Sequence, residues 1–250
     1  MILMGKYREL LFSQTKRIGK DNLMLLLSVY PALLGIIGRY LVPWLRRVFI
    51  ESFEYDIIVH YPAILVFFIL ANPYIYGALA AFTVLEEREE GVFHAIRVTP
   101  LTLQRYMGAK IFGLVVISIA SGMFVTWVVN LISIGLWQSF VINTLLAFAA
   151  PFSMIAINCY SNNRVEGFAL TKGSGILIML PLLGFYIPEK FHFFVAIIPG
   201  YWPAMSINKV VNPSFGFMPY WSYAVAGFVY ILVLIRIFHK RFERKLSESR

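Results

Sequence analysis

Long runs without charge dominate the pattern of hydrophobic and polar positions along this chain. Residues 111–163 contain no Asp, Glu, Lys or Arg. A transmembrane helix needs about 20 mainly apolar residues, so this run has room for two spans joined by a short connection. A soluble protein seldom leaves so long a stretch uncharged, because its surface must face water. The pattern therefore predicts an integral membrane protein.

Shorter charge-poor stretches elsewhere bring the number of predicted transmembrane helices to six, in an all-α fold. The predicted spans are residues 23–41, 61–84, 111–134, 138–159, 168–187 and 219–237. The first reaches full length only if Arg39 extends its guanidinium to an interface. In the second, Asn72 and Pro73 follow Pro62 and predict a kink, which is either a packing feature or the mark of a flexible or cavity-lining helix.

The distribution of charge predicts the orientation. Hydrophobic residues make up 59% of the chain, charged residues 14%, and the net charge is +9. With six spans both termini share one side, and that side carries 17 of the 22 Lys and Arg residues. The positive-inside rule then predicts cytoplasmic termini in a multi-pass protein of the cell membrane, most simply a bacterial plasma membrane. The basic flanks suit contact with anionic membrane lipids, and no basic-aromatic module points to nucleic acid.

The whole chain, residues 1–250, is expected to form a single transmembrane domain. Residues 1–22 predict an amphipathic helix on the membrane surface, with a disordered basic tail as the alternative. Residues 188–218 predict a broken extracellular hairpin between the fifth and sixth spans. Its apolar piece, residues 191–198, suggests an interfacial or re-entrant helix. Several aromatic residues are expected in a belt at the headgroups, namely Tyr201, Trp202, Tyr220, Trp221 and Tyr223.

The sequence contains none of the familiar catalytic patterns. It has no H-E-x-x-H, no G-x-S-x-G and no G-x-x-x-x-G-K-[ST] phosphate loop, so any nucleotide must be held by another chain. No Asp or Glu lies well inside a predicted span, which argues against a proton-coupled transporter. Cys159 is expected to be a buried apolar side chain. The histidines are scattered near span ends or loops, at His60, His94, His192 and His239. We therefore expect no catalytic residue and no metal site.

One segment, residues 86–104, has the sequence pattern of an ordered structural element and not that of a simple solvated loop. Four acidic residues end the second span, at Glu86, Glu87, Glu89 and Glu90. Gly91 then breaks the helix. Thr99-Pro100 resembles an N-cap followed by proline at the first helical position, and is expected to open the third span.

Between Gly91 and Thr99 the pattern predicts a short helix. Val92, Phe93 and Ile96 fall on one side of it. A solvated connection would need no apolar face, so these side chains either dock into a groove on a partner or lie back on the headgroups.

This segment resembles the signature of ATP-binding-cassette type-2 permeases, which reads acidic-x-G-[TV]-x-x-x-[IL]-x-[VT]-[TS]-P-[LV]-[ST] and ends in G-x-K. The matching residues are Glu90, Gly91, Val92, Ile96, Val98, Thr99, Pro100, Leu101, Thr102, Gly108 and Lys110. The span count, the amphipathic N-terminal helix and the broken outer hairpin also fit that family. Residues 164–170 and 199–203 resemble a subgroup that includes drug- and peptide-exporter permeases.

The resemblance implies a permease that pairs with a second permease subunit, forming a homodimer or a heterodimer. Two copies of an ATP-binding-cassette ATPase subunit would hold ATP and Mg²⁺, and this chain would bind no cofactor. The short helix would be a cytoplasmic coupling helix, and its coupling residues would be Gly91, Val92, Phe93, Ile96, Arg97, Thr99 and Pro100. The acidic residues would pair with the N-terminal helix or the partner, or form a solvated helix end.

The function implied is export of a hydrophobic or amphipathic substrate, such as a drug, peptide or lipid, from the cytoplasm or inner leaflet. ATP hydrolysis in the separate subunit would drive it, and this chain would not be an enzyme. The substrate cavity would lie near a two-fold axis, lined mainly by the second and fifth spans. The alternatives are a non-transporting assembly or immunity protein and, less favoured, a membrane-embedded lipid-modifying enzyme.

Overall fold

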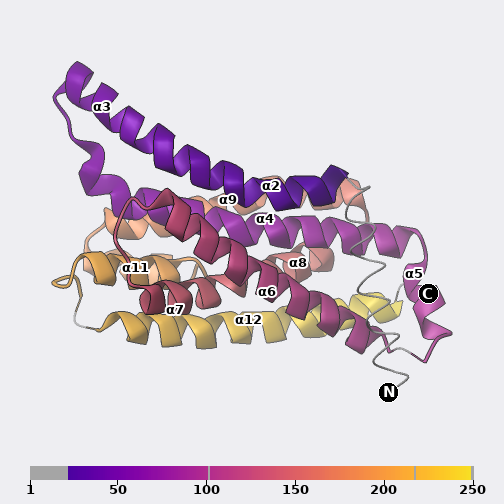
Figure 1. Cartoon of the computed structure of the whole chain (residues 1–250). Coiled ribbons are helices and arrows are strands. Elements are labelled where there is room, and N and C mark those ends of the chain that lie inside the picture. The colour runs from indigo at the N-terminus through magenta and orange to yellow at the C-terminus, as the bar shows by residue number, and fades with distance from the viewer. Residues whose placement is uncertain (1–21, 101, 217, 249–250) are drawn as a thin grey trace.

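A computed structural model describes residues 22–100, 102–216 and 218–248, and within these ranges the chain is helical with no strand (Figure 1). The long helices lie side by side in a bundle (Figure 1). In chain order the elements are α2 (Asn22–Ile36), the π-helix η1 (Ile37–Leu41), α3 (Val42–Phe53), η2 (Ile57–His60), α4 (Tyr61–Glu89), α5 (Val92–Arg97), α6 (Leu103–Val129), α7 (Leu136–Ala147), α8 (Ala149–Tyr160), α9 (Arg164–Met179), η3 (Leu180–Phe185), η4 (Glu189–Phe191), α10 (His192–Val195), α11 (Tyr201–Val211) and α12 (Tyr220–Glu248).

Five helical stretches in the described residues are long and apolar enough to cross a membrane. They are Ile57–Glu89, Leu103–Val129, Leu136–Tyr160, Arg164–Phe185 and Tyr220–Phe242. They correspond to the second through sixth predicted spans, so the all-helical membrane fold is confirmed. The first predicted span, residues 23–41, is helical in α2 and η1 but is not among the five. A sixth span and the cytoplasmic position of the termini therefore stay predictions, and residues 1–21 lie outside the described part.

The helix of the third span begins three residues later than the predicted start at Thr99-Pro100. The N-cap of α6 is Thr102, whose Oγ1 accepts a hydrogen bond from the Arg105 amide at 3.3 Å. Thr99 instead closes α5, because its hydroxyl donates to the Ile96 carbonyl at 2.7 Å. The prediction that Thr99-Pro100 opens the third span is therefore wrong by three residues. Both threonines have capping side chains, and only the path of the chain decides which of them starts the long helix.

The central element of the bundle is α4, which packs against α8, α6, α9, α2 and α11. In its most apolar stretch 72% of the residues are buried. Gly77 permits a close approach of α8, since a Cβ at that position would lie 2.4 Å from the Ala150 carbonyl oxygen. Asn72, beside Pro73, is fully buried and donates from Nδ2 to the Ser121 hydroxyl of α6 at 2.8 Å. The part of α4 that contains Asn72 and Pro73 thus lies in the packed interior of the bundle.

The hairpin between the fifth and sixth spans differs from its prediction. The buried element is α11, in which Ala204, Met205 and Ile207 are fully buried, whereas residues 191–198 hold only the single turn α10. Apolar side chains of that piece, Phe193 and Phe194 among them, are exposed. A single helical turn is too short to enter and leave a membrane, so these residues do not form the re-entrant helix, and the interfacial alternative stays a prediction.

Polar contacts hold this hairpin together. Tyr201, predicted in an aromatic belt, is only 5% exposed, and its hydroxyl bonds with His192 Nδ1 at 2.9 Å. Trp221 is exposed, as a belt residue would be. Lys209 Nζ donates to three backbone carbonyls of the following turn, those of Pro213, Phe215 and Gly216. The hairpin is therefore held together internally by side-chain hydrogen bonds.

Replacing Gly77 by alanine should lower the thermal unfolding temperature of the protein in detergent. The added Cβ meets the Ala150 backbone, so α4 and α8 must separate, at a cost of about 1–3 kcal/mol. Gly113→Ala on α6 is the matched control, because nothing lies within 4 Å of an added Cβ there. It should be neutral or slightly stabilising, since alanine is the better helix former. Equal effects of the two substitutions would show that the α4–α8 approach is not tight.

Candidate coupling site

A short helix, α5, joins the ends of α4 and α6 at one end of the bundle, near the C-terminal end of α12 (Figure 1). The preceding helix ends because Gly91 adopts φ +71°, a left-handed conformation that favours glycine. Nothing lies within 4 Å of a Cβ built on Gly91, so the residue is needed for its backbone angle and not for space. The break predicted at Gly91 is present.

The apolar side of α5 faces its own chain. Phe93 is 5% exposed and Ile96 is 9% exposed, and both belong to a buried cluster that includes Leu85 and Met107. Val92, half-buried, packs against the same cluster. The expectation that Phe93 and Ile96 are available to a partner groove is therefore wrong. A short amphipathic helix buries its apolar face on the nearest apolar surface, which here is formed by the ends of α4 and α6.

The opposite side of α5 is open. His94 and Ala95 are exposed, and so are Thr99 and Pro100 just beyond the helix. Val98 is 87% exposed. Arg97 is the last residue of α5, and its side chain lies outside the described part of the structure. We call the surface formed by His94, Ala95, Val98, Thr99 and Pro100 the outer face of α5.

The acidic residues at the end of α4 pair with other helices of this chain. Arg164, the first residue of α9, donates to Glu86 Oε1 at 2.9 Å and to Glu89 Oε2 at 2.8 Å. Glu87 Oε1 accepts from Lys110 Nζ at 2.5 Å and from the Tyr106 hydroxyl at 2.7 Å, both on α6.

Within the described residues these three glutamates therefore pair with cations of α6 and α9. Their pairing with the predicted N-terminal helix, which lies outside the described residues, or with a partner stays a prediction. Glu90 is exposed.

Two further cations gather at the C-terminal end of α8. Arg88 Nη1 donates to the Ser161 carbonyl at 3.3 Å, and Lys245 Nζ donates to the same oxygen at 2.7 Å and to the Cys159 carbonyl at 3.2 Å. Cations are favourable there because a helix ends in unpaired carbonyls and a partial negative charge. Burial, reinforced by the nearby charge of Arg88, lowers the pKa of Lys245. Cys159 is buried, as expected.

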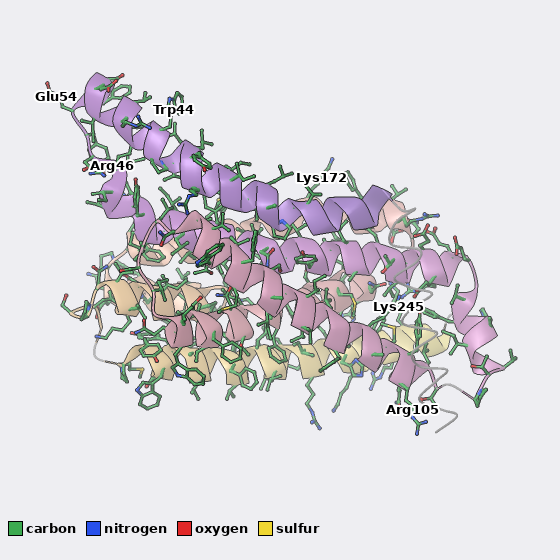
Figure 2. The ribbon with its side chains drawn as sticks, viewed as in Figure 1. Trp44, Arg46, Glu54, Arg105, Lys172 and Lys245 are labelled. Carbon is green, nitrogen blue, oxygen red and sulfur yellow. The ribbon has the colours of Figure 1, made fainter. Side chains whose placement is uncertain are left out.

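Together these residues join five helices at the end of the bundle that carries α5. We call this set the charged collar, and it consists of Glu86, Glu87, Arg88, Glu89, Lys110, Arg164 and Lys245. Figure 2 shows Lys245 and Arg105 at this end, with Trp44, Arg46 and Glu54 at the opposite end. The sequence did contain a signal for Arg164 and Lys245, since both are cations predicted on the same side of the membrane as the acidic residues.

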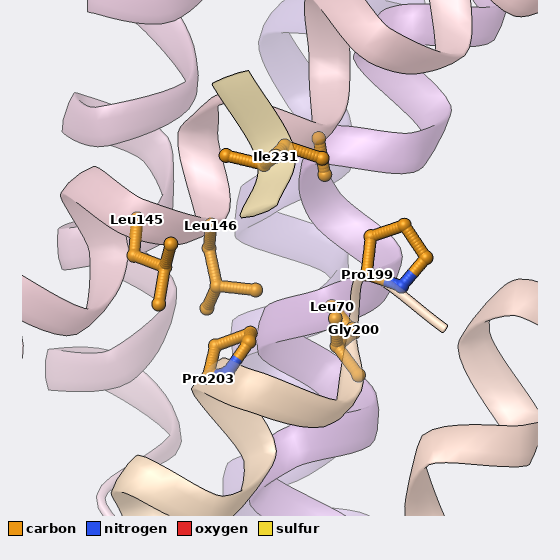
Figure 3. Close-up of a pocket in the computed structure, with 8 residues that line it drawn as sticks. Leu70, Leu145, Leu146, Pro199, Gly200, Pro203 and Ile231 are labelled. Carbon is orange, nitrogen blue, oxygen red and sulfur yellow. The ribbon is translucent and has the colours of Figure 1, made fainter. Parts of the chain in front are cut away.

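An apolar gap lies in the middle of the bundle, where α11 meets α4, α7, α8 and α12 (Figure 3). It is lined by Leu70, Leu145, Leu146, Ala149, Pro199, Gly200, Pro203 and Ile231. The space open to the centre of a water-sized sphere is about 10 Å³, which is room for about one water. No polar side chain lines the gap, so it is a small packing void and not a substrate site.

Two of the four histidines, His60 and His192, make structural contacts with tyrosine hydroxyls. His60 bonds to the hydroxyls of Tyr55 and Tyr186, and His192 bonds to Tyr201. In residues 22–100, 102–216 and 218–248 there is no group of three or more His, Cys, Asp and Glu side chains that could hold a metal ion.

Fold and site define the class of this protein. It is a multi-pass, all-helical membrane protein in which two long helices, α4 and α6, are joined by a short surface helix and fastened by a charged collar.

The chain belongs to the family described as Fluoroquinolones export permease protein Rv2686c-like, whose model matches residues 14–239. It is similar to two proteins of Mycobacterium tuberculosis, "Fluoroquinolones export permease protein Rv2686c" of strain ATCC 25618 / H37Rv and "Fluoroquinolones export permease protein MT2760" of strain CDC 1551 / Oshkosh. Each is 28% identical over 229 residues, covering 90% of this chain and 89% of the relative. The family name describes a permease rather than an enzyme.

Replacing Lys110 by methionine should destabilise the protein by about 2 kcal/mol in detergent, because it leaves the Glu87 carboxylate half-buried without its cation. Both side chains of the pair are 20% exposed, which places this cost below that of a fully buried pair. The double variant Glu87→Gln with Lys110→Met should recover most of the loss, since no unpaired charge remains. Chemical unfolding of the four proteins in the cycle measures the coupling. Simple additivity of the two single effects would show that the pair contributes nothing.

Proposed function

We propose that this chain is the membrane-spanning subunit of an ATP-binding-cassette type-2 exporter. In this proposal two copies of the chain pair in a bacterial cell membrane, and two separate ATPase subunits bind ATP and Mg²⁺ on the cytoplasmic side. The substrate is hydrophobic or amphipathic and leaves from the cytoplasm or the inner leaflet. The family and the printed names of its two relatives support the exporter role. No observation favours the alternatives of an immunity protein or a lipid-modifying enzyme.

The observation that carries the proposal is the position of α5. It is anchored by Phe93 and Ile96 on the ends of α4 and α6, while its outer face is open to a partner. A force applied to this helix is transmitted directly to two membrane-crossing helices, because packed side chains leave little room for the element to move alone. In this proposal the residues of the predicted coupling segment, 91–100, have two different roles. Phe93 and Ile96 hold the element in place, and the outer face meets the ATPase.

The small size of the void inside the bundle supports a substrate path between two copies of the chain. The void between α11 and α4 holds about one water, which is far too little for a drug or a lipid. The most apolar stretch of the α9 span is only 12% buried, against 72% for α4. A second copy could cover such a surface, and a substrate could pass between the two copies without opening either bundle.

Val98→Glu should uncouple the permease from its ATPase. The substitution places a charge on the outer face of α5, so co-purification with the ATPase subunit and ATP-driven extrusion of a fluoroquinolone from proteoliposomes should each fall about tenfold or more. The unfolding temperature should not change, because Val98 is 87% exposed.

Val165→Glu is the matched control, since Val165 on α9 is 81% exposed near the same end of the bundle. It should leave coupling intact. Phe93→Ala should instead lower the unfolding temperature, as expected for a buried anchor. Normal ATP-driven transport by Val98→Glu would contradict the docking role, and transport that persists with a disabled ATPase would overturn the proposed function.

A further inference from the structure

Lys172 is a charged residue within Arg164–Phe185, a helical stretch long and apolar enough to cross a membrane. It follows Arg164, the first residue of the α9 span, by eight residues and precedes Phe185, the last, by thirteen. At 1.5 Å per residue it lies about 12 Å along the helix from Arg164, the residue through which α9 joins the charged collar. The four-carbon stem of Lys172 covers only part of that distance, so its ammonium does not reach the carboxylates that pair with Arg164.

The charge of Lys172 is not neutralised within the described residues. Lys110 of the charged collar, by contrast, pairs with the Glu87 carboxylate at 2.5 Å. In the described part of the chain no carboxylate lies within 4.0 Å of Lys172, and its Nζ lies instead over the ring of Phe168, 5.0 Å from the centroid. Charged residues inside a membrane are costly, and they usually mark a water-filled cavity or a substrate pathway.

The surface around Lys172 is open and otherwise apolar. Figure 2 shows Lys172 at the surface of the bundle, and the side chain is exposed. Phe168 and Ile176 lie four residues before and after it, on the same side of the helix, and both are more than half exposed. The adjacent Gly173 and Gly175 are exposed, and nothing lies within 4 Å of a Cβ built on either. A cation therefore stands between two apolar side chains with free space beside it.

We propose that this surface, formed by Phe168, Lys172 and Ile176, selects substrates that carry an anionic group on an apolar body. Lys172 would bind the carboxylate or phosphate, and Phe168 and Ile176 would contact the apolar part. An amphipathic carboxylate and an anionic lipid headgroup share this chemistry. The inference deepens the proposed export function by naming the substrate class, and it rests on that function only for the consequence in transport.

Equilibrium binding tests the proposal without the ATPase. The probes are pyrenebutyrate, a fluorescent carboxylate, and its uncharged methyl ester, titrated onto the full chain in zwitterionic micelles. The wild-type protein should bind the carboxylate about tenfold more tightly than the ester. Lys172→Gln should lose that preference through weaker carboxylate binding, with ester binding changed less than about twofold. Lys172→Arg should keep the preference, because the cation remains.

Lys190→Gln is the matched control, since Lys190 also lies over an aromatic ring, that of Phe191, but in the hairpin. It should behave as the wild type does. Added phosphatidylglycerol separates the two sources of the anion. If it competes with pyrenebutyrate for the wild type but not for Lys172→Gln, the same lysine also binds a lipid phosphate. If it does not compete with pyrenebutyrate, the site is assigned to a free amphipathic carboxylate.

Equal affinity of the wild type for both probes, equal losses for both in Lys172→Gln, or the same loss in Lys190→Gln would each overturn the proposal. Failure of ATP-driven transport with charge selectivity intact would overturn the export function alone.

Discussion

The packing of α4 against its neighbours is the interaction on which the rest of this structure depends. Its apolar stretch is mostly buried, and at Gly77 it approaches the backbone of α8 too closely for a Cβ to fit between them. In a membrane the hydrophobic effect does not drive helices together, so close contact and buried polar bonds such as Asn72 with Ser121 must do so. A movement of α4, which ends at the charged collar, would therefore displace the helices packed against it.

The charged collar and α5 act on the same end of α4. The collar joins α4 to α6, α8, α9 and α12, and its most exposed ion pairs, those of Arg164 with Glu86 and Glu89, are individually weak. The anchoring of α5 by Phe93 and Ile96 is instead apolar and buried. This contrast would allow α5, α4 and α6 to move together. The buried apolar contacts keep α5 attached to α4 and α6, whereas partly solvated ion pairs such as Arg164 with Glu89 can break and re-form at small cost.

The fold was largely predictable from the sequence, because the bilayer requires long uncharged runs and these are visible directly. The details of the site were not. Nothing local distinguishes Thr102 from Thr99 as the cap of α6, or an apolar face that docks on a partner from one that docks on its own chain. The three-dimensional path decides both. Residues 201–211 were also missed as the buried element of the hairpin, since α11 is too short to resemble a span and its burial depends on helices far away in sequence.

The contrast between a closed interior and an open α9 constrains how such a chain could move a substrate. The apolar void near α11 has room for about one water, so a bundle of this kind would have to open its core or use its outer surface to move a substrate. Opening the core would separate α4 from α8 and expose buried polar groups such as Asn72 and Asn143 to lipid, which is costly. Using the surface requires only that the faces of two rigid bundles move apart and together. In the proposed dimer the cheaper motion is therefore between subunits, and Lys172 lies on the exposed face of α9 that this motion would affect.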